Sequence, residues 1–245
     1  APEISRRRRA GQFVIVRMRE GGERIPLTIA DADAERGSIT LVVQEVGRTT
    51  AEMAHLMAVG DRFIDVLGPL GMPTHIERYG KVMTVGGGIG VAPVHPIAQA
   101  MRAAGNEVVG VLGARSQNLI IMEAEMRRAC DRVRIVTDDG SYGDKGFVTD
   151  AIRAESEAGK PDLVLAIGPM VMMRAVSKLT KELGIRTMVS LNPVMVDGTG
   201  MCGGCRVTVG GKTKFVCVDG PEFDGHEVDF DELMRRQRFY AGDEK

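Results

Sequence analysis

From Lys81 onward the chain alternates short apolar runs with longer amphipathic stretches, and this alternation constrains the fold more than any other feature. The apolar runs read KVMTVGG, EVVGVLG, RVRIVT, DLVLAIG and IRTMVSL. The stretches between them have helical character, for example IMEAEMRRAC, FVTDAIRAESEAG and MVMMRAVSKLTKELG. Strands that alternate with helices in this way form a parallel sheet with helices on both faces. We therefore predict an α/β domain over residues 79–191.

The preceding part of the chain carries β-rich runs of a different kind. GQFVIVRM and SITLVVQEVG are separated by the turn-like segments REGGER and ADADAERGS, and one helical stretch lies near TAEMAHLM. Short strands joined by Gly- and Asp-rich turns are typical of a small antiparallel β-barrel. We predict such a barrel over residues 1–78. Because a strand-like segment follows so soon after Ala1, an initial strand of this domain is expected upstream.

Charge and composition exclude several classes of partner. The 245 residues include 32 basic and 33 acidic side chains, for a net charge of -1, so no overall field attracts nucleic acid or anionic lipid. The absence of Trp removes the aromatic platforms on which single-stranded nucleic acids stack. No apolar run approaches the roughly 20 residues that span a bilayer. We expect a cytoplasmic protein whose partners are a small molecule and another protein.

Three of the four cysteines lie close together near the C-terminus, as Cys202, Cys205 and Cys217. Two residues separate the first pair within a glycine-rich loop, and an alternating segment that reads as a hairpin strand precedes Cys217. This spacing is typical of a metal site and not of a disulfide framework. Three thiolates can therefore converge on one ion or cluster, and we predict a small metal-binding segment over residues 192–245.

The fourth ligand is not a Cys or His in this loop. Asp197 lies five residues before Cys202, and its carboxylate can bind iron. Zinc sites usually take four Cys or His ligands, so three thiolates with an Asp favour a 2Fe-2S cluster. Structural zinc and incidental cysteines are the alternatives. Cys130 stands alone at the end of an apolar helix face, and we expect it to be buried and unreactive.

A second motif, VGGGIGVAP, follows the first strand of the α/β domain and opens a helix. Glycines let the backbone approach a pyrophosphate, and a helix N-terminus offers it free N–H groups. Pro93 stands where the third glycine of the usual G-x-G-x-x-G pattern would be, and its fixed φ suits a first helical turn. Glycine-rich turns also occur for packing reasons, but the position at the first strand-to-helix turn predicts a nucleotide site.

A third motif, ERIPLTIAD, lies in the predicted barrel. Arg24 and Thr28 could hold a flavin phosphate and the edge of its ring system. Taken alone, the segment is better interpreted as an ordinary edge strand with an exposed arginine.

In combination, ERIPLTIAD, TVGGGIGVAP, TDDGSYGDKGFVTD and MVDGTGMCGGC resemble the ferredoxin-NADP reductase superfamily over essentially the whole chain. The resemblance is to the branch of dihydroorotate dehydrogenase electron-transfer subunits, and within it to the small subunits of NADH-dependent reduced ferredoxin:NADP oxidoreductases. It implies an FAD-binding barrel, a nicotinamide-nucleotide domain and a C-terminal 2Fe-2S segment. In the dihydroorotate enzymes a Cys occupies the position of Asp197. The bifurcating branch instead uses one Asp and three Cys, so this difference favours that branch.

The resemblance also implies site residues. The implied FAD contacts are Arg24, Pro26, Leu27 and Thr28, with Val46, Gly47, Thr49 and Thr50 at the pyrophosphate. The implied nicotinamide-nucleotide contacts are Gly87, Gly88, Ile89, Gly90, Gly113, Ala114, Arg115, Asp138, Gly168, Pro169 and Met170. The implied cluster ligands are Asp197, Cys202, Cys205 and Cys217. Hydride transfer needs no acid-base residue, and none is assigned as catalytic.

Arg115 suggests a 2′-phosphate and hence NADPH, because the acidic residue that usually contacts the NAD ribose is missing near the end of the second strand. Related NADH-using subunits share this arginine, so NADH is favoured over NADPH.

The implied function is that of an electron-transfer flavoprotein subunit, which oxidises NADH through FAD and a 2Fe-2S cluster within an electron-bifurcating transhydrogenase. The implied partner is a larger subunit with a second FAD and 4Fe-4S clusters, which reacts with NADPH and ferredoxin. Service to a dihydroorotate dehydrogenase or another oxidoreductase is the alternative. A non-catalytic, zinc-containing interaction module is the alternative from another class.

Overall fold

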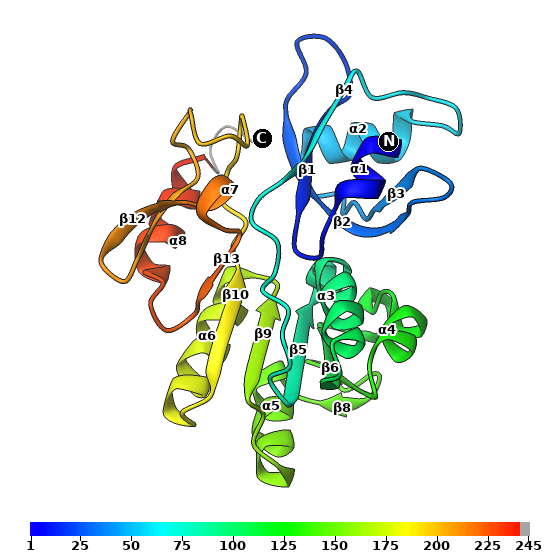
Figure 1. Ribbon diagram of the computed structural model, residues 1–245. Helices are drawn as coiled ribbons and strands as arrows, with labels where there is room; N and C mark the ends of the chain where they lie inside the picture. The colour runs from blue at the N-terminus through cyan, green and yellow to red at the C-terminus, as the bar shows by residue number, and fades with distance from the viewer. Residues whose placement is uncertain (241–245) are drawn as a thin grey trace. The chain divides into compact units, whose positions relative to one another are not determined.

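The apolar runs of the second half form the centre of a seven-stranded sheet in the computed structural model, which describes residues 1–240 (Figure 1). Its strands are β5 (Lys81–Gly87), β6 (Glu107–Ala114), β7 (Arg132–Thr137), β8 (Asp144–Lys145), β9 (Leu163–Ile167), β10 (Arg186–Ser190) and β13 (Glu222–Asp224). Their order is β13-β10-β9-β5-β6-β7-β8, and only β13 runs antiparallel to its neighbour. The predicted parallel sheet is confirmed.

Helices connect these strands as the alternation predicts. They are α3 (Val91–Ala103), α4 (Glu123–Ala129), α5 (Val148–Ala158) and α6 (Met170–Glu182), with short 3-10 turns η1 (Gly88–Gly90) and η2 (Gln117–Leu119). α3 contacts α4, and α5 contacts α6. Every residue of β9 is buried, as expected for a central parallel strand covered on both faces.

The order of the strands creates a crevice at one position. From β5 the chain moves outward through β6 and β7, and then returns through α5 to place β9 on the other side of β5. In open α/β sheets, ligands bind beyond the carboxyl ends of the strands where the order reverses in this way. The carboxyl ends of β5 and β9 are therefore the expected binding position.

The first part of the chain forms an antiparallel sheet with the order β3-β2-β1-β4. Its strands are β1 (Phe13–Arg17), β2 (Ile25–Asp33), β3 (Ser38–Leu41) and β4 (Asp65–Leu70), and it is accompanied by α1 (Pro2–Arg7) and α2 (Arg48–Leu56). Val14, Val16, Ile29 and Met53 form its buried core. The antiparallel sheet and the helix are confirmed.

The four strands form an open sheet, whereas the sequence predicts a small antiparallel barrel. Among the described residues β3 and β4 do not pair with each other, so each remains an edge strand. The chain between them contains α2 and irregular segments in place of further strands. Closure needs continuous pairing around the sheet, and these segments do not supply it.

The C-terminal segment contains a hairpin and three short elements. They are β11 (Arg206–Val209), β12 (Lys212–Phe215), α7 (Val216–Asp219), β13 and α8 (Phe230–Tyr240). The hairpin before Cys217 is confirmed. The last five residues of the predicted segment 192–245 lie outside the described residues.

The structure divides into two compact units. Residues 1–73, 192–221 and 229 onward form the first, while 74–191 and 222–228 form the second. The segment that the sequence analysis set apart from residue 192 onward is thus divided between the units, because β13 pairs with β10. No helix in the described part of the chain is long and apolar enough to cross a membrane.

Cys130 is buried, as predicted. It is 4% exposed, and its thiol lies 4.0 Å from the Thr84 hydroxyl. Desolvation raises the pKa of this thiol to about 11. The reactive thiolate is therefore scarce near neutral pH.

Glu222 on β13 should make stability depend on pH. Its carboxylate accepts a hydrogen bond of 2.5 Å from the Thr74 hydroxyl, and desolvation raises its pKa from 4.5 to about 7. Because the folded protein holds this proton more tightly than the unfolded chain, stability should fall as pH rises from about 4.5 to about 7. Glu222→Gln should reduce this fall in the free energy of unfolding by about 2 kcal/mol, a figure that allows for the partial solvent exposure of Glu222 in the folded protein.

Urea unfolding between pH 4 and 8 measures the effect. Glu227→Gln is the matched control, because Glu227 is exposed in the same segment. A wild-type minus Glu222→Gln difference that stays flat across this range would contradict the prediction.

Candidate functional site

The residues expected to contact a nicotinamide nucleotide lie at the carboxyl edge of the parallel sheet. Gly87 ends β5 and pairs in register with Gly113 of β6, while Gly86 pairs with Ile167 at the end of β9. The remaining members lie at or directly after the strand ends: Gly88, Ile89 and Gly90 in η1, Ala114 and Arg115 at the end of β6, Asp138 after β7, Gly168 and Pro169 after β9, and Met170 at the start of α6. The structure therefore gathers this set on one edge.

The glycines of this edge have different roles. A Cβ at Gly90 would overlap the carbonyl oxygen of Ile167, and one at Gly87 would overlap the Met172 sulfur. Gly88 instead has a φ of 54° and open space where a side chain would point. Gly90 is thus required for packing, because a backbone oxygen cannot move aside, whereas at Gly87 the flexible Met172 side chain would have to shift. Gly88 leaves the backbone accessible to a ligand.

The edge also offers positive charge. No side chain caps the N-terminus of α3, so the partial positive charge of the helix end faces the edge without a side-chain partner. Arg115 is exposed and forms no ion pair within the described part of the chain. These features suit the phosphates of a dinucleotide. Asp138, also exposed, follows β7 on the same edge.

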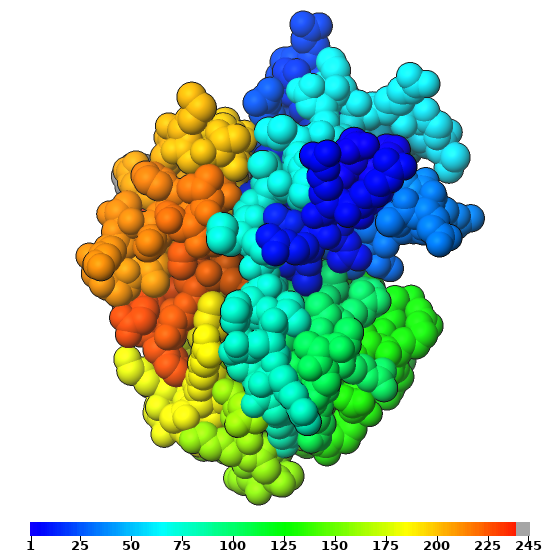
Figure 2. Space-filling view, viewed as in Figure 1, coloured from blue at the N-terminus to red at the C-terminus, as the bar shows by residue number. Residues whose placement is uncertain are grey.

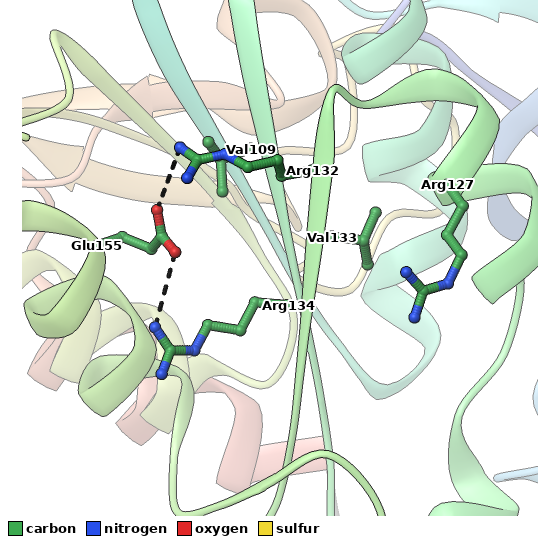
Figure 3. Close-up of a pocket in the computed structure, with 6 residues that line it drawn as sticks. All are labelled: Val109, Arg127, Arg132, Val133, Arg134 and Glu155. Atoms are coloured by element: carbon green, nitrogen blue, oxygen red, sulfur yellow. Dashed lines mark ion pairs between the residues drawn. The ribbon is translucent and has the colours of Figure 1, made fainter. Parts of the chain in front are cut away.

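A pocket of about 430 Å³ lies elsewhere on the same sheet (Figure 3). It is lined by Val109, Arg127, Arg132, Val133, Arg134 and Glu155. Arg132 and Arg134 reach Glu155 at 3.5 and 3.6 Å on one side of β7, while Val133 and Arg127 lie on the other. Because it lies at the amino halves of β6 and β7 and its arginines are paired with carboxylates, it is not the nucleotide site.

The first four residues expected to contact FAD lie at the start of β2. Pro26 and Thr28 pair with Ile15 and Phe13 of β1, and Leu27 packs against the core of the sheet. By strand alternation, Pro26 and Thr28 lie on the face opposite Leu27. Arg24 precedes the strand and contacts Asp65 at 3.7 Å. The group is contiguous, and Arg24 is held by a carboxylate.

The other four residues expected to contact FAD surround the N-terminus of α2. The Thr50 hydroxyl accepts hydrogen bonds of 3.0 Å from the N–H groups of Val46 and Gly47, and Thr49 donates to the Glu23 carboxylate. Both hydroxyls are thus engaged in holding the turn. The N–H groups of the first turn of this nine-residue helix are the groups best placed for a phosphate.

The cysteine loop is ordered by hydrogen bonds to its own side chains. Asp197 accepts from the N–H groups of Thr199 at 2.8 Å and Cys202 at 2.6 Å, and these bonds lower the pKa of the carboxyl. The Cys202 sulfur accepts from Gly204 N–H at 3.4 Å, and the Cys205 sulfur from Cys217 N–H at 3.5 Å. The backbone thus stabilises negative charge on ligand-type atoms.

The four predicted cluster ligands fall into two neighbouring pairs. The Cys205 and Cys217 sulfurs are buried and 3.2 Å apart, and burial raises the pKa of Cys217 to about 12. The Asp197 carboxylate accepts a hydrogen bond from the backbone N–H of Cys202, whose side chain is exposed. No three or more such side chains within residues 1–240 gather around one point as a single metal ion requires.

Two arginines near this loop were missed from the sequence. Arg206 contacts the carbonyl oxygen of Gly203 at 3.5 Å, and Arg236 of α8 contacts that of Gly204 at 3.4 Å. Arg206 directly follows Cys205, which was a usable signal. Arg236 lies 31 residues beyond Cys205 in a charged tail, and nothing in the spacing points to it.

Models of two protein families match the chain. Residues 84–178 match the oxidoreductase NAD-binding domain, and residues 192–229 match the iron-sulfur cluster binding domain of dihydroorotate dehydrogenase B. The first range contains all the residues expected to contact a nicotinamide nucleotide at the carboxyl edge, and the second contains Asp197 and the three clustered cysteines.

Whole-chain relatives agree with this division. A Thermotoga maritima protein described as a dihydroorotate dehydrogenase B (NAD(+)) electron transfer subunit homolog is 52% identical, over 100% of this chain and 86% of its own length. The protein described as the dihydroorotate dehydrogenase B (NAD(+)) electron transfer subunit of Geobacillus thermodenitrificans is 36% identical, over 89% of this chain and 86% of its own length.

Solved structures show the same similarity. A chain of the NADH-dependent reduced ferredoxin-NADP oxidoreductase structure, described in connection with flavin-based electron bifurcation, superposes with a TM-score of 0.94 at 49% identity. The match covers 99% of this chain and 87% of that one. A cytochrome P450 reductase from Amycolatopsis, at 24% identity and a TM-score of 0.62, covers 71% of this chain and 57% of that one and shares the fold.

Two glycine substitutions should separate packing from accessibility. Gly90→Ala should lower the free energy of unfolding by about 3 kcal/mol, because its Cβ meets a backbone oxygen that cannot move aside. Gly88→Ala should cost about 1 kcal/mol, because it strains only its own left-handed backbone. Urea unfolding of both variants measures the difference, and equal costs would show that the edge is not packed as described.

Proposed function

Because the chain belongs to the family of dihydroorotate dehydrogenase B electron-transfer subunits, and is an oxidoreductase subunit with an NAD-binding and an iron-sulfur domain, we propose that it oxidises NADH through FAD and delivers single electrons to a 2Fe-2S cluster. The observation that carries the proposal is the arrangement of the cysteine loop. Two irons need two pairs of ligands, and the loop supplies Cys205 with Cys217 and Asp197 with Cys202.

FAD, when bound, accepts a hydride from NADH and releases its two electrons one at a time, which suits a one-electron cluster. The first-turn N–H groups of α2 would bind its pyrophosphate. Arg24 would add a positive charge to that site once released from Asp65, which Arg17 also contacts at 2.5 Å. Pro26 and Thr28 would meet the flavin from the strand face opposite Leu27.

The carboxyl edge of the parallel sheet would bind NADH. Gly88 lets the pyrophosphate approach the backbone, and the N-terminus of α3 favours its charge. Met170 and its two preceding residues would border the nicotinamide, and Asp138 and Arg115 would lie toward the ribose. The protein binds and orients the nucleotide, and no side chain has to move a proton for hydride transfer.

Asp197 and the three clustered cysteines would hold the iron-sulfur cluster. Cys217 must lose its proton to bind iron, and its raised pKa makes this loss depend on the metal. Asp197 brings a harder oxygen ligand, and its low pKa keeps the carboxylate ionised.

We further propose that the surface around this loop docks a larger subunit with a further flavin and 4Fe-4S centres, through which the electrons exchange with ferredoxin and NADP. Val194, Val196, Met201 and Val218 are exposed there, and Met201 is 88% exposed. The loop lies on the face seen in Figure 2, where it appears in gold. Adjacent exposed apolar side chains are typical of a protein interface. The likeness to a bifurcating ferredoxin-NADP oxidoreductase supports this partner.

A second candidate function is electron transfer as a subunit of a dihydroorotate dehydrogenase, which the names of the Thermotoga and Geobacillus relatives favour. The two candidates share the same reaction in this chain and differ in the partner. Purification of the native complex and the ability of that complex to reduce NADP or orotate distinguish them.

The visible spectrum and low-temperature EPR of the anaerobically purified chain test the proposal. The protein should be yellow-brown, and NADH should bleach the flavin and produce the signal of a reduced 2Fe-2S cluster. Asp197→Cys should retain a cluster with a shifted signal, and Asp197→Ala should lose iron. A colourless protein that contains zinc would contradict the proposed function and favour a non-catalytic interaction module.

Nucleotide preference supplies a second test. NADH should be oxidised with a higher kcat/KM than NADPH. Arg115→Gln should change the KM for NADH less than about twofold, because a guanidinium near the ribose interacts most strongly with a 2′-phosphate, which NADH lacks. A loss of kcat/KM of more than about tenfold with NADH would contradict this prediction.

A further inference from the structure

The C-terminal helix α8 is fixed against the hairpin that carries the cysteine loop. Asp229 accepts a hydrogen bond of 2.8 Å from Glu232 N–H at the start of the helix, and its own N–H bonds to the Thr208 carbonyl at 2.9 Å. The Glu232 carboxylate accepts from Thr208 N–H at 3.2 Å, and Leu233 is 1% exposed. The helix is therefore a rigid support for the side chains on its next turn.

Arg236 is on that next turn, and it reaches the loop between two of the proposed ligands. Its guanidinium contacts the carbonyl oxygen of Gly204 at 3.4 Å, directly between Cys202 and Cys205. Arg206 approaches the same turn from β11 and contacts the Gly203 carbonyl at 3.5 Å. Two cations thus converge on one two-residue turn.

Within the described residues neither Arg206 nor Arg236 forms an ion pair with a carboxylate, whereas Arg17, Arg102 and Arg134 do. Asp219, the next acidic residue after the loop, is paired with Lys214 at 3.7 Å. The two guanidinium groups held at the Gly203 and Gly204 carbonyl oxygens therefore place positive charge directly beside the proposed ligands.

A 2Fe-2S cluster bound by these ligands would carry a net negative charge. Three thiolates and the Asp197 carboxylate bring more negative charge than the iron-sulfur core neutralises, and reduction adds one electron. Positive charge nearby stabilises the reduced form more than the oxidised form, and so raises the reduction potential.

We propose that Arg236, together with Arg206, is a positioning residue that holds the turn between Cys202 and Cys205 and raises the reduction potential of the cluster. This inference rests on the proposed function and concerns how readily the same site accepts its electron. It connects the C-terminal helix, which contains no proposed ligand, to the redox chemistry.

The test is an EPR-monitored redox titration of the cluster in the full chain, with dithionite as reductant. Arg236→Gln should lower the ratio of reduced to oxidised cluster at a fixed potential about tenfold. This corresponds to a fall in midpoint potential of about 59 mV for one electron. Arg236→Lys should restore most of this change, since it keeps the charge. Arg235→Gln is the matched control, because the neighbouring arginine is exposed on the same helix and forms no hydrogen bond or ion pair with the loop among residues 1–240.

An unchanged midpoint in Arg236→Gln at full iron content, or an equal change in Arg235→Gln, overturns the inference. If Arg236→Gln loads less iron, Arg206→Gln decides in its place: the same direction of change supports the inference, and no change overturns it. Wild-type protein without an iron-sulfur signal would instead refute the proposed function, so the two failures are distinguishable.

Discussion

The nucleotide edge depends on the close approach of the turn after β5 to the end of β9. Gly90 touches the backbone at Ile167, where no side chain fits, and this contact sets the position of the first turn of α3. Because β9 lies beside β5 through the reversal of strand order, the turns after both strands meet at one edge. Gly90, which holds this edge together, therefore has a different role from Gly88, which leaves the edge open to a ligand.

The cysteine loop follows a different principle. Its shape is set by a carboxylate and two sulfurs that accept backbone N–H groups, so the loop is ordered around its prospective ligands. The same bonds that fix the backbone also stabilise negative charge on those atoms. Arg206 and Arg236, which have no carboxylate partner in the described part of the chain, complete the surroundings. Order and electrostatics are thus supplied by the same few groups.

The parallel sheet, the glycine edge and the cysteine hairpin could be predicted because each has a local signal: apolar periodicity, Gly spacing and Cys spacing. The open form of the antiparallel sheet could not, because closure depends on pairing between β3 and β4, which are distant in the sequence. The hydrogen bonds that the Thr49 and Thr50 hydroxyls form within the turn could not be predicted either, because turn-forming and ligand-binding threonines look alike in a sequence. Arg236 was missed because its contact with Gly204 exists only after α8 packs on β11.

The route of the chain between the units limits how this protein can be divided. Residues 222–228 return to the parallel sheet between two segments that belong to the other unit. A fragment ending at residue 191 would lack β13 and leave β10 as an unprotected edge that invites aggregation. Neither unit is a contiguous stretch of sequence, so a single cut cannot release one intact. A fragment that keeps the parallel sheet complete would therefore need residues 222–228 joined to residues 74–191.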